Sequence, residues 1–337
     1  MKKTGLASVD KPWQQYYGEE LVKADIPEKT IYDYMADNNR DYPKDIAIEY
    51  FSRKITFGKM LAGIEKTAQA FLTLGVQKGD IVTVALPSIP EALYCLYGLN
   101  RIGAVVNLIH PLAGEEETLR YLQEVNSKVA VLFTKTFQDI KNSIQKTNLK
   151  FIITVSAMQS VFPVHLVGKT GGRSGILGWD AFIRQRKQTG ISVCKNPKEV
   201  AVISHTGGTT GIPKGVMLSD NNINACIWQI GCNIPHERQE VYMSVLPPFI
   251  NYSLVNSMLE PLAFGFKVVL IPNYKPLKFG KYVKKYQPNH ISSIPAYWEA
   301  CLKIHFGKNA LDCLEHIYYG GTHFRKKWRS RSMRFCG

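Results

Sequence analysis

The sequence predicts an α/β protein built from layered βαβ subdomains, and three observations support this fold class. Short segments rich in β-branched residues, such as 81–86 and 104–109, have the length and composition of buried strands. Segments with apolar residues at helical spacing separate them, and this alternation indicates parallel βαβ units. The 337 residues are 45% hydrophobic and 20% charged, which suffices for one large domain or two packed subdomains.

Predicted helices and strands alternate through the first half of the chain. Apolar residues fall on one face of a helix over 57–74, and Gly75 ends this helix. The following strands are predicted at 81–86, 104–109, 129–133 and 151–154, with helices at 90–102, 115–126 and 137–147.

Residues 159–190 interrupt the alternation, because they are rich in Gly, Ser, Lys and Arg and have little periodicity. This composition predicts a long surface excursion. The alternation then resumes, with strands predicted at 200–203, 241–246, 267–271, 291–294 and 316–319. We therefore expect a first subdomain over 1–190, with its loop-rich excursion near 159–190, and a second over 191–321. A basic tail follows over 322–337.

The composition also indicates in which compartment of the cell the protein is expected. No apolar run is long enough to span a bilayer, and no apolar segment follows the basic start at Met1-Lys2-Lys3. Seven cysteines scattered over a long chain suit reduced thiols, so we expect a cytoplasmic protein. The formal net charge of +15 favours contact with polyanions, or it is simply a solvated basic surface.

The most informative segment for function is the glycine-rich loop over residues 204–216. It follows the short strand 200–203 and precedes a helix predicted from about Asp220. Free backbone N–H groups, threonine hydroxyls and one lysine are the groups that a polyphosphate requires. The residues that carry this chemistry are Thr206, Gly207, Gly208, Thr209, Thr210, Gly211 and Lys214. The segment is not a Walker A sequence, because Pro213 precedes the lysine.

The run from Thr206 to Gly215 resembles the phosphate-binding signature of the adenylate-forming, AMP-dependent synthetase and ligase superfamily. Its two glycines before Thr-Thr-Gly are similar to those of fatty-acyl-CoA ligases. Flanking segments extend the resemblance up to Gly321, and it implies the N-terminal domain of that family, incomplete here. In this resemblance Gly320 and Gly321 form a turn whose backbone approaches adenine and the acyl group. The segments that flank the acyl pocket contain Phe249, Ile250, Tyr252 and Tyr297.

The resemblance implies a ligase that uses ATP, Mg²⁺ and coenzyme A. A carboxylate attacks the α-phosphorus of ATP, and the thiol of coenzyme A then displaces AMP to give a thioester. Positioning and charge neutralisation would carry the first step. Thr206, Thr209, Thr210 and Lys214 would hold the departing phosphates, with Mg²⁺ bridging phosphate oxygens. We expect a medium- or long-chain fatty acid as the substrate, with an aryl acid as the alternative.

The resemblance stops after Gly321. The family pattern continues with an adenine motif, a ribose-binding Asp and a small C-terminal domain that carries the adenylation lysine; this sequence has none of them. The tail over 322–337 is instead basic and without an acidic residue, and we interpret it as the product of a shifted reading frame. The alternative is a genuine tail that contacts RNA or anionic lipid. A product ending at Gly337 is expected to have little or no ligase activity.

A Cys/His group at Cys301, His305, Cys313 and His316 has separations that match no standard zinc site, so we expect no protein-bound metal. A non-catalytic, basic fragment that binds nucleotide or nucleic acid is the alternative to an enzyme. The expected partners are therefore the acid, ATP and coenzyme A; no specific nucleic acid is expected, and weak peripheral contact with a membrane stays open.

Overall fold

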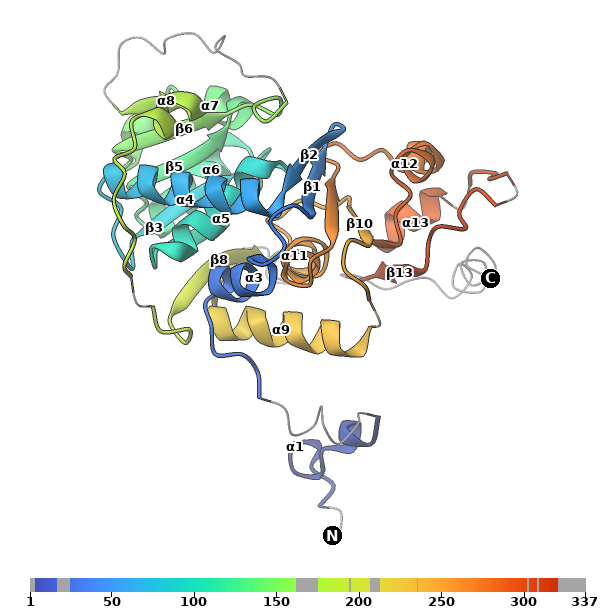
Figure 1. The fold of residues 1–337 in the computed structure, drawn as a ribbon. Coiled ribbons are helices and arrows are strands. Elements are labelled where there is room, and N and C mark those ends of the chain that lie inside the picture. The colour runs from blue at the N-terminus through green and yellow to red at the C-terminus, as the bar shows by residue number, and fades with distance from the viewer. Residues whose placement is uncertain are drawn as a thin grey trace.

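The computed structural model describes residues 4–16, 25–161, 175–193, 195–206, 213–234, 236–301, 303–307 and 309–320. Within these ranges the chain forms two mainly parallel sheets with helices packed against them (Figure 1). This arrangement confirms the predicted layered α/β fold class. Among the described helices, none combines the length and the apolar content that crossing a membrane requires.

The first sheet has the strand order β7-β6-β5-β3-β4-β8-β9. Neighbouring strands are parallel except β8 and β9, which form an antiparallel hairpin. The strands are β3 (Ile81–Ala85), β4 (Val105–Leu108), β5 (Val129–Phe133), β6 (Phe151–Val155), β7 (Ile176–Gly178), β8 (Val200–Thr206) and β9 (Lys214–Ser219).

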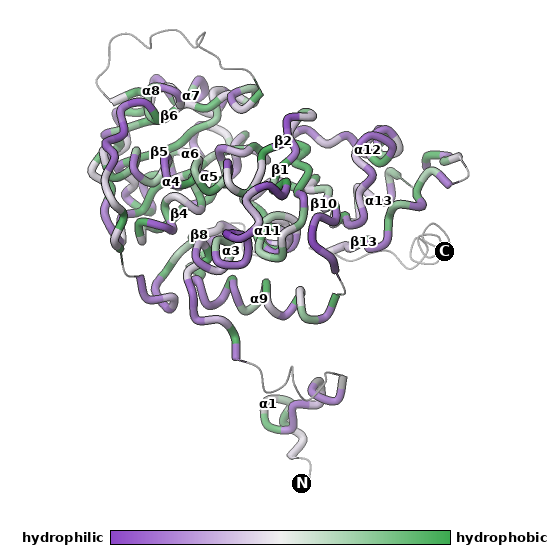
Figure 2. Tube along the Cα trace, viewed as in Figure 1, coloured by the Kyte–Doolittle hydropathy of each residue, from purple (hydrophilic) through white to green (hydrophobic). Residues whose placement is uncertain are grey.

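Helices cover both faces of this sheet. On one face lie α4 (Phe57–Thr73), α5 (Pro90–Arg101) and α8 (Trp179–Arg184); on the other lie α6 (Glu115–Glu124) and α7 (Thr134–Ile140). Side chains alternate between the two cores along each strand, so Val131 of β5 joins the first core while Ala130 and Leu132 join the second. Burial on both faces explains why these strands are nearly continuous apolar runs, as the colouring of β5 and β6 shows (Figure 2).

The second sheet has the order β13-β12-β10-β11-β1-β2, with all neighbours parallel except β1 and β2. Its strands are β1 (Ile46–Tyr50), β2 (Arg53–Thr56), β10 (Val241–Ser244), β11 (Lys267–Leu270), β12 (His290–Ser293) and β13 (His316–Tyr319). One face packs against α12 (Phe279–Tyr286) and α13 (Pro295–Cys301).

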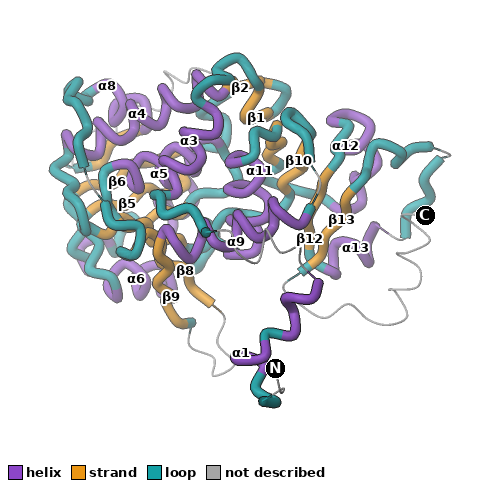
Figure 3. Tube along the Cα trace, turned by 60° about the horizontal axis from the view of Figure 1, so that its bottom comes forward, coloured by secondary structure: helices purple, strands orange, loops and turns teal. Residues whose placement is uncertain are grey.

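The large core that joins the two sheets contains α3 (Ile31–Asn39), α9 (Asp220–Asn233) and a composite helix. The composite helix consists of α10 (Asn251–Leu254), a π-helical turn η3 (Val255–Leu259) and α11 (Glu260–Ala263). In Figure 3, β8 and β9 lie on one side of α9, and β12 and β13 lie on the other. The short elements are α1 (Ala7–Asp10), η1 (Pro12–Tyr16), η2 (Ile144–Lys146) and η4 (Pro276–Lys278).

The structure reproduces most predicted elements and adds others. The strands predicted at 129–133 and 316–319 coincide with β5 and β13, and α9 begins at the predicted Asp220 behind a capping box of Ser219 and Asn222. The prediction that 159–190 is only a surface excursion was wrong for its described part, since 175–190 contains β7 and α8. Buried Trp179 and Phe182 hold α8 in place, and the Phe182 ring lies 4.9 Å from that of Phe71.

The two sheets exchange strands across the predicted subdomain division at residue 190. The early strands β1 and β2 belong to the second sheet, whereas β8 and β9 belong to the first. The glycine-rich loop therefore leaves from the edge of the first sheet. The predicted tail over 322–337 lies outside the described residues.

Candidate functional site

The β8–β9 hairpin presents the ends of the predicted phosphate-binding loop. Thr206, the last residue of β8, pairs with Lys214, the first residue of β9, and both side chains are exposed. Gly207, Gly208, Thr209, Thr210 and Gly211 lie outside the described residues. The two residues that flank the loop thus place one hydroxyl group and one ammonium group on neighbouring strands. Both groups can donate hydrogen bonds to phosphate oxygens.

His205 anchors the base of this hairpin. Its Nε2 lies 2.8 Å from Oδ1 of Asn107 on β4, and its ring packs 4.1 Å from that of Tyr121, centroid to centroid. The Asn107 amide in turn donates to the hydroxyl of Thr83 on β3 at 3.1 Å. Burial lowers the pKa of His205, which favours the neutral ring. These contacts give His205 a packing role next to the loop.

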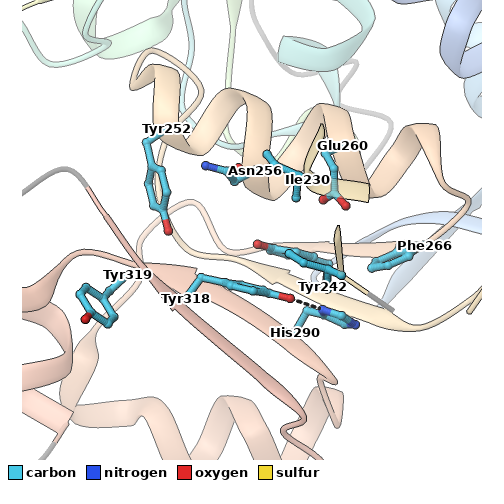
Figure 4. Close-up of a pocket in the computed structure, with 10 residues that line it drawn as sticks. Ile230, Tyr242, Tyr252, Asn256, Glu260, Phe266, His290, Tyr318 and Tyr319 are labelled. Atoms are coloured by element: carbon cyan, nitrogen blue, oxygen red, sulfur yellow. Dashed lines mark hydrogen bonds between the residues drawn. The ribbon is translucent and has the colours of Figure 1, made fainter. Parts of the chain in front are cut away.

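A cavity of about 270 Å³ lies at the C-terminal end of α9. It lies between strands β10, β12 and β13 on one side and the C-terminal part of α9 and the composite helix on the other, and it is partly open (Figure 4). Its lining consists of Ile230, Ile234, Tyr242, Tyr252, Asn256, Glu260, Phe266, His290, Tyr318 and Tyr319.

The strand side of the cavity is a nearly continuous aromatic surface. Tyr242 and His290 are register partners on β10 and β12, and their rings are within 13° of parallel. Tyr318 on β13 is within 9° of parallel with Tyr242, at 6.3 Å between ring centroids. Side chains two residues apart on a strand share a face, so adjacent parallel strands place these rings side by side.

Two polar contacts fix the imidazole of His290 in this surface. Its Nε2 lies 2.8 Å from a carboxylate oxygen of Glu240, and its Nδ1 lies 3.1 Å from the hydroxyl of Tyr318. Burial lowers the pKa of His290, although Glu240 acts in the opposite direction. A neutral ring that donates its Nε2–H to Glu240 accepts a hydrogen bond from the Tyr318 hydroxyl at Nδ1. Both ring nitrogens are then engaged.

The helix side of the cavity carries Tyr252, Asn256 and Glu260, which are spaced four residues apart. In an α-helix, side chains four residues apart differ by about 40° around the helix axis. The π-helical turn over Val255–Leu259 widens the helix and keeps the three side chains on the cavity side (Figure 4). Glu260 is only 4% exposed. Burial raises the pKa of Glu260 to about 8.

The structure brings two of the sequence-derived site residues together. Gly320 lies directly against Tyr252: a Cβ added to Gly320 would stand 2.6 Å from Cε2 of the Tyr252 ring. Both residues therefore belong to the end of the cavity where β13 meets the composite helix. Gly321 lies outside the described residues.

The other residues predicted for the acyl pocket lie elsewhere. The ring of Phe249 packs 4.4 Å from that of His110, and its carbonyl accepts a hydrogen bond from the hydroxyl of Ser204 on β8 at 3.4 Å. Ile250 is the N-cap residue of α10. The ring of Tyr297 lies 5.4 Å from that of Tyr274, in the core under α12 and α13. These three residues do not line the described cavity.

Sequence reasoning missed the most polar part of the cavity. Asn256, Glu260, His290 and Tyr318 were not among the predicted site residues, although Glu260 offers a signal. It is an acidic residue within the apolar run 254–264, and such a residue is seldom buried without a reason. Its i, i+4, i+8 spacing with Tyr252 was a second signal.

No group of three or more His, Cys, Asp or Glu side chains is placed to hold a metal within the part of the chain that the structure describes. The thiol of Cys301 donates to the carbonyl of Pro276 at 3.6 Å and lies 3.7 Å from the hydroxyl of Tyr274. His316 stacks on His290 at 4.7 Å between ring centroids.

Comparisons with known proteins place this geometry in context. Residues 35–337 match the model of the family described as AMP-binding enzyme, and this range includes the basic segment from residue 322. A long-chain-fatty-acid–CoA ligase of Bacillus subtilis is 28% identical over 313 residues, which are 86% of this chain and 54% of that protein. The chain thus spans about half the length of the curated relatives that it matches.

Solved structures show the same fold. A long-chain-fatty-acid–CoA ligase from Archaeoglobus fulgidus matches with a TM-score of 0.79 at 18% identity, over 92% of this chain and 61% of that one. An anthranilate–CoA ligase in complex with anthranoyl-AMP matches with a TM-score of 0.78 at 17% identity, over 92% of this chain and 59% of that one.

Proposed function

Because the chain belongs to the AMP-binding enzyme family, we propose that it binds ATP at the β8–β9 hairpin and a carboxylic acid in the cavity beyond α9. The proposed activity of the whole protein is that of an AMP-forming acid–CoA ligase. The observation that carries this proposal is that α9 begins directly after β9 of the hairpin, while its C-terminal end lines the cavity. One helix therefore links the two candidate sites.

The hairpin supports the nucleotide half of the proposal. Lys214 is exposed at the mouth of the loop and would neutralise charge on the departing pyrophosphate. The hydroxyl of Thr206, on the facing strand, would donate to a phosphate oxygen. His205 holds the strand end through Asn107 and keeps this pair in register. Mg²⁺ would enter with the nucleotide and supply further charge neutralisation.

The cavity supports the acid half of the proposal. Its rings and aliphatic side chains would bury the non-reacting part of the acid and exclude water from it. Gly320 leaves room for Tyr252 at the cavity end, where the predicted adenine turn begins. These residues position the acid, and positioning is the main contribution that a protein makes to such a transfer.

The class of acid is open between the fatty acid favoured by the sequence and the aryl acid kept as the alternative. The similar proteins include ligases named for both kinds of acid. An aromatic wall with a buried carboxyl group favours an acid with a flat or polar body over a plain alkyl chain.

The proposal is tested by calorimetric titration of the 337-residue protein with ATP, with and without Mg²⁺. We expect ATP to bind, and Mg²⁺ to strengthen the binding. Failure of the folded protein to bind ATP under either condition would contradict the proposal.

A further inference from the structure

The cavity contains a buried carboxyl group that lacks a partner. Glu260 is 4% exposed and projects from α11 into the cavity (Figure 4). Within the described part of the chain, its side chain has no hydrogen bond or ion pair with any other residue. Burying an unpaired carboxyl group costs free energy of folding. A ligand group that pairs with this carboxyl group should therefore bind here with a favourable free energy.

The lining of the cavity offers no internal cation for this carboxyl group. No Lys or Arg side chain is among the described lining residues. The one imidazole, that of His290, is engaged at Nε2 with Glu240 and at Nδ1 with Tyr318. The raised pKa of Glu260 has burial as its cause, in agreement with the absence of a nearby positive charge.

Aromatic rings surround the position that a partner of Glu260 would occupy. Tyr242 and Phe266 approach it from the strand side, and Figure 4 shows both rings below the Glu260 carboxyl group. Their ring centroids are 6.3 Å apart, and the Phe266 ring also packs 5.0 Å from His290. A carboxylate opposite aromatic rings is a suitable environment for an ammonium group, because the rings and the carboxylate both attract positive charge.

We propose that the cavity selects an acid that carries a positively charged amine or quaternary ammonium group at the end remote from its carboxylate. This inference rests on the proposed function, since it assigns the cavity to the acid. The cationic end would lie between Glu260 and the rings of Tyr242 and Phe266. The reacting carboxylate would point toward Tyr252 and Gly320, at the opposite end of the row of helix residues.

A matched pair of acids tests the charge preference. Trimethylammoniobutanoate is compared with its carbon isostere, in which a quaternary carbon replaces the nitrogen and leaves the shape unchanged. We expect the cationic acid to bind the wild-type protein at least about tenfold more tightly in calorimetric titration, the scale of one desolvated ion pair or cation–π contact. Equal binding of the two acids, or tighter binding of the isostere, would overturn the inference.

Variants assign the preference to the carboxyl group. Glu260→Gln keeps the shape of the side chain and removes its charge, so it should abolish most of the preference while binding of the isostere is unchanged or improved. Glu260→Asp should retain part of the preference. Glu116→Gln changes the net charge equally at an exposed position of α6 and should have no effect. A preference that persists in folded Glu260→Gln would contradict the role of this residue.

Two further outcomes separate this inference from the proposed function. If neutral aryl or fatty acids bind while cationic acids do not, the inference fails and the proposed function stands. If ATP binds but acids of every class fail to bind, the assignment of the cavity to the acid fails, and the inference fails with it.

Discussion

Gly320 lies so close to the ring of Tyr252 that a Cβ at position 320 would stand 2.6 Å from Cε2 and 2.9 Å from Cζ. Gly320 directly follows β13 and Tyr252 lies in α10, so the two residues are far apart in the sequence. A contact this tight means that glycine is required for the Tyr252 ring to keep its position at the end of the cavity.

Gly320→Ala should therefore displace the Tyr252 ring. We expect a loss of stability of about 1–3 kcal/mol, as for other overpacked sites, and weaker binding of acids in the cavity. Thermal unfolding and acid titration measure the two effects. The control is Gly190→Ala, because a Cβ at Gly190 would have no atom within 4 Å. Unchanged stability and acid binding in Gly320→Ala would show that the ring can move without cost.

Lys214 is expected to contribute to nucleotide binding through its charge. Lys214→Ala should weaken ATP binding by about tenfold, the scale of one charge-assisted hydrogen bond, and should leave acid binding unchanged. Calorimetric titration with ATP measures the change. Lys281→Ala removes the same charge from an exposed position of α12 and should have no effect. Equal affinities of all three proteins for ATP would argue against a phosphate-binding role for Lys214.

Glu260 should make the stability of the protein depend on pH. Burial raises its pKa from 4.5 to about 8, so between these values the folded state binds a proton that the unfolded state has released. Stability therefore falls as pH rises through this window and is lowest above pH 8. The charge of Glu260 also acts on the nearby hydroxyls of Tyr34, Tyr242 and Tyr318, whose pKa values it raises together with burial.

Comparison with Glu260→Gln isolates this contribution, because the other titrating groups are common to both proteins. The variant should gain stability relative to wild type as pH rises from 5 to 9, by roughly 4 kcal/mol in total. Urea unfolding at a series of pH values measures this difference. A stability difference that stays constant over the range would indicate that Glu260 is ionised in the folded state throughout.

The buried ion pair of Lys195 and Asp220 should be essential for stability. Nζ of Lys195 lies 2.8 Å from Oδ2 of Asp220, and their side chains are 2% and 0% exposed. Asp220→Ala leaves a buried ammonium without a partner, and it also removes the acceptor for the Asn100 amide and the Ile31 N–H. We expect a loss of about 3–5 kcal/mol in chemical unfolding.

Asp37 provides the control for this prediction, because its ion pair with Lys29 is exposed to solvent. Asp37→Ala should cost less than about 1 kcal/mol. Similar losses for the two variants would mean that the Lys195–Asp220 pair is not sealed from water as its burial indicates.

The parallel core was the most predictable part of the fold. Strands such as β5 are buried on both faces, and their continuous apolar sequences are visible without any tertiary information. The β1–β2 hairpin gave no such signal. Its turn residues Phe51 and Ser52 both have positive φ values, 47° and 70°, although glycine or asparagine is usual in such turns. Packing of the surrounding strands evidently compensates for this local cost.

Only part of the candidate site could be predicted from the sequence, because much of it depends on tertiary contacts. Thr206 and Lys214 are eight positions apart in a distinctive loop, so the sequence alone identifies them. The cavity, in contrast, is assembled from strands β10, β12 and β13 and from two helices. The role of Glu260 depends on the π-helical turn that precedes it, and no local sequence pattern predicts that turn.

The central claim is that the hairpin and the cavity form one site for an adenylated acid. Its most direct test is calorimetric titration of the protein with an acyl sulfamate of adenosine, a stable mimic of the acyl-adenylate, beside titrations with AMP and with the free acid. If the two sites are continuous, the mimic should bind at least about a hundredfold more tightly than either part alone. An affinity no greater than that of AMP would mean that the cavity does not receive the acyl group, and would contradict the account.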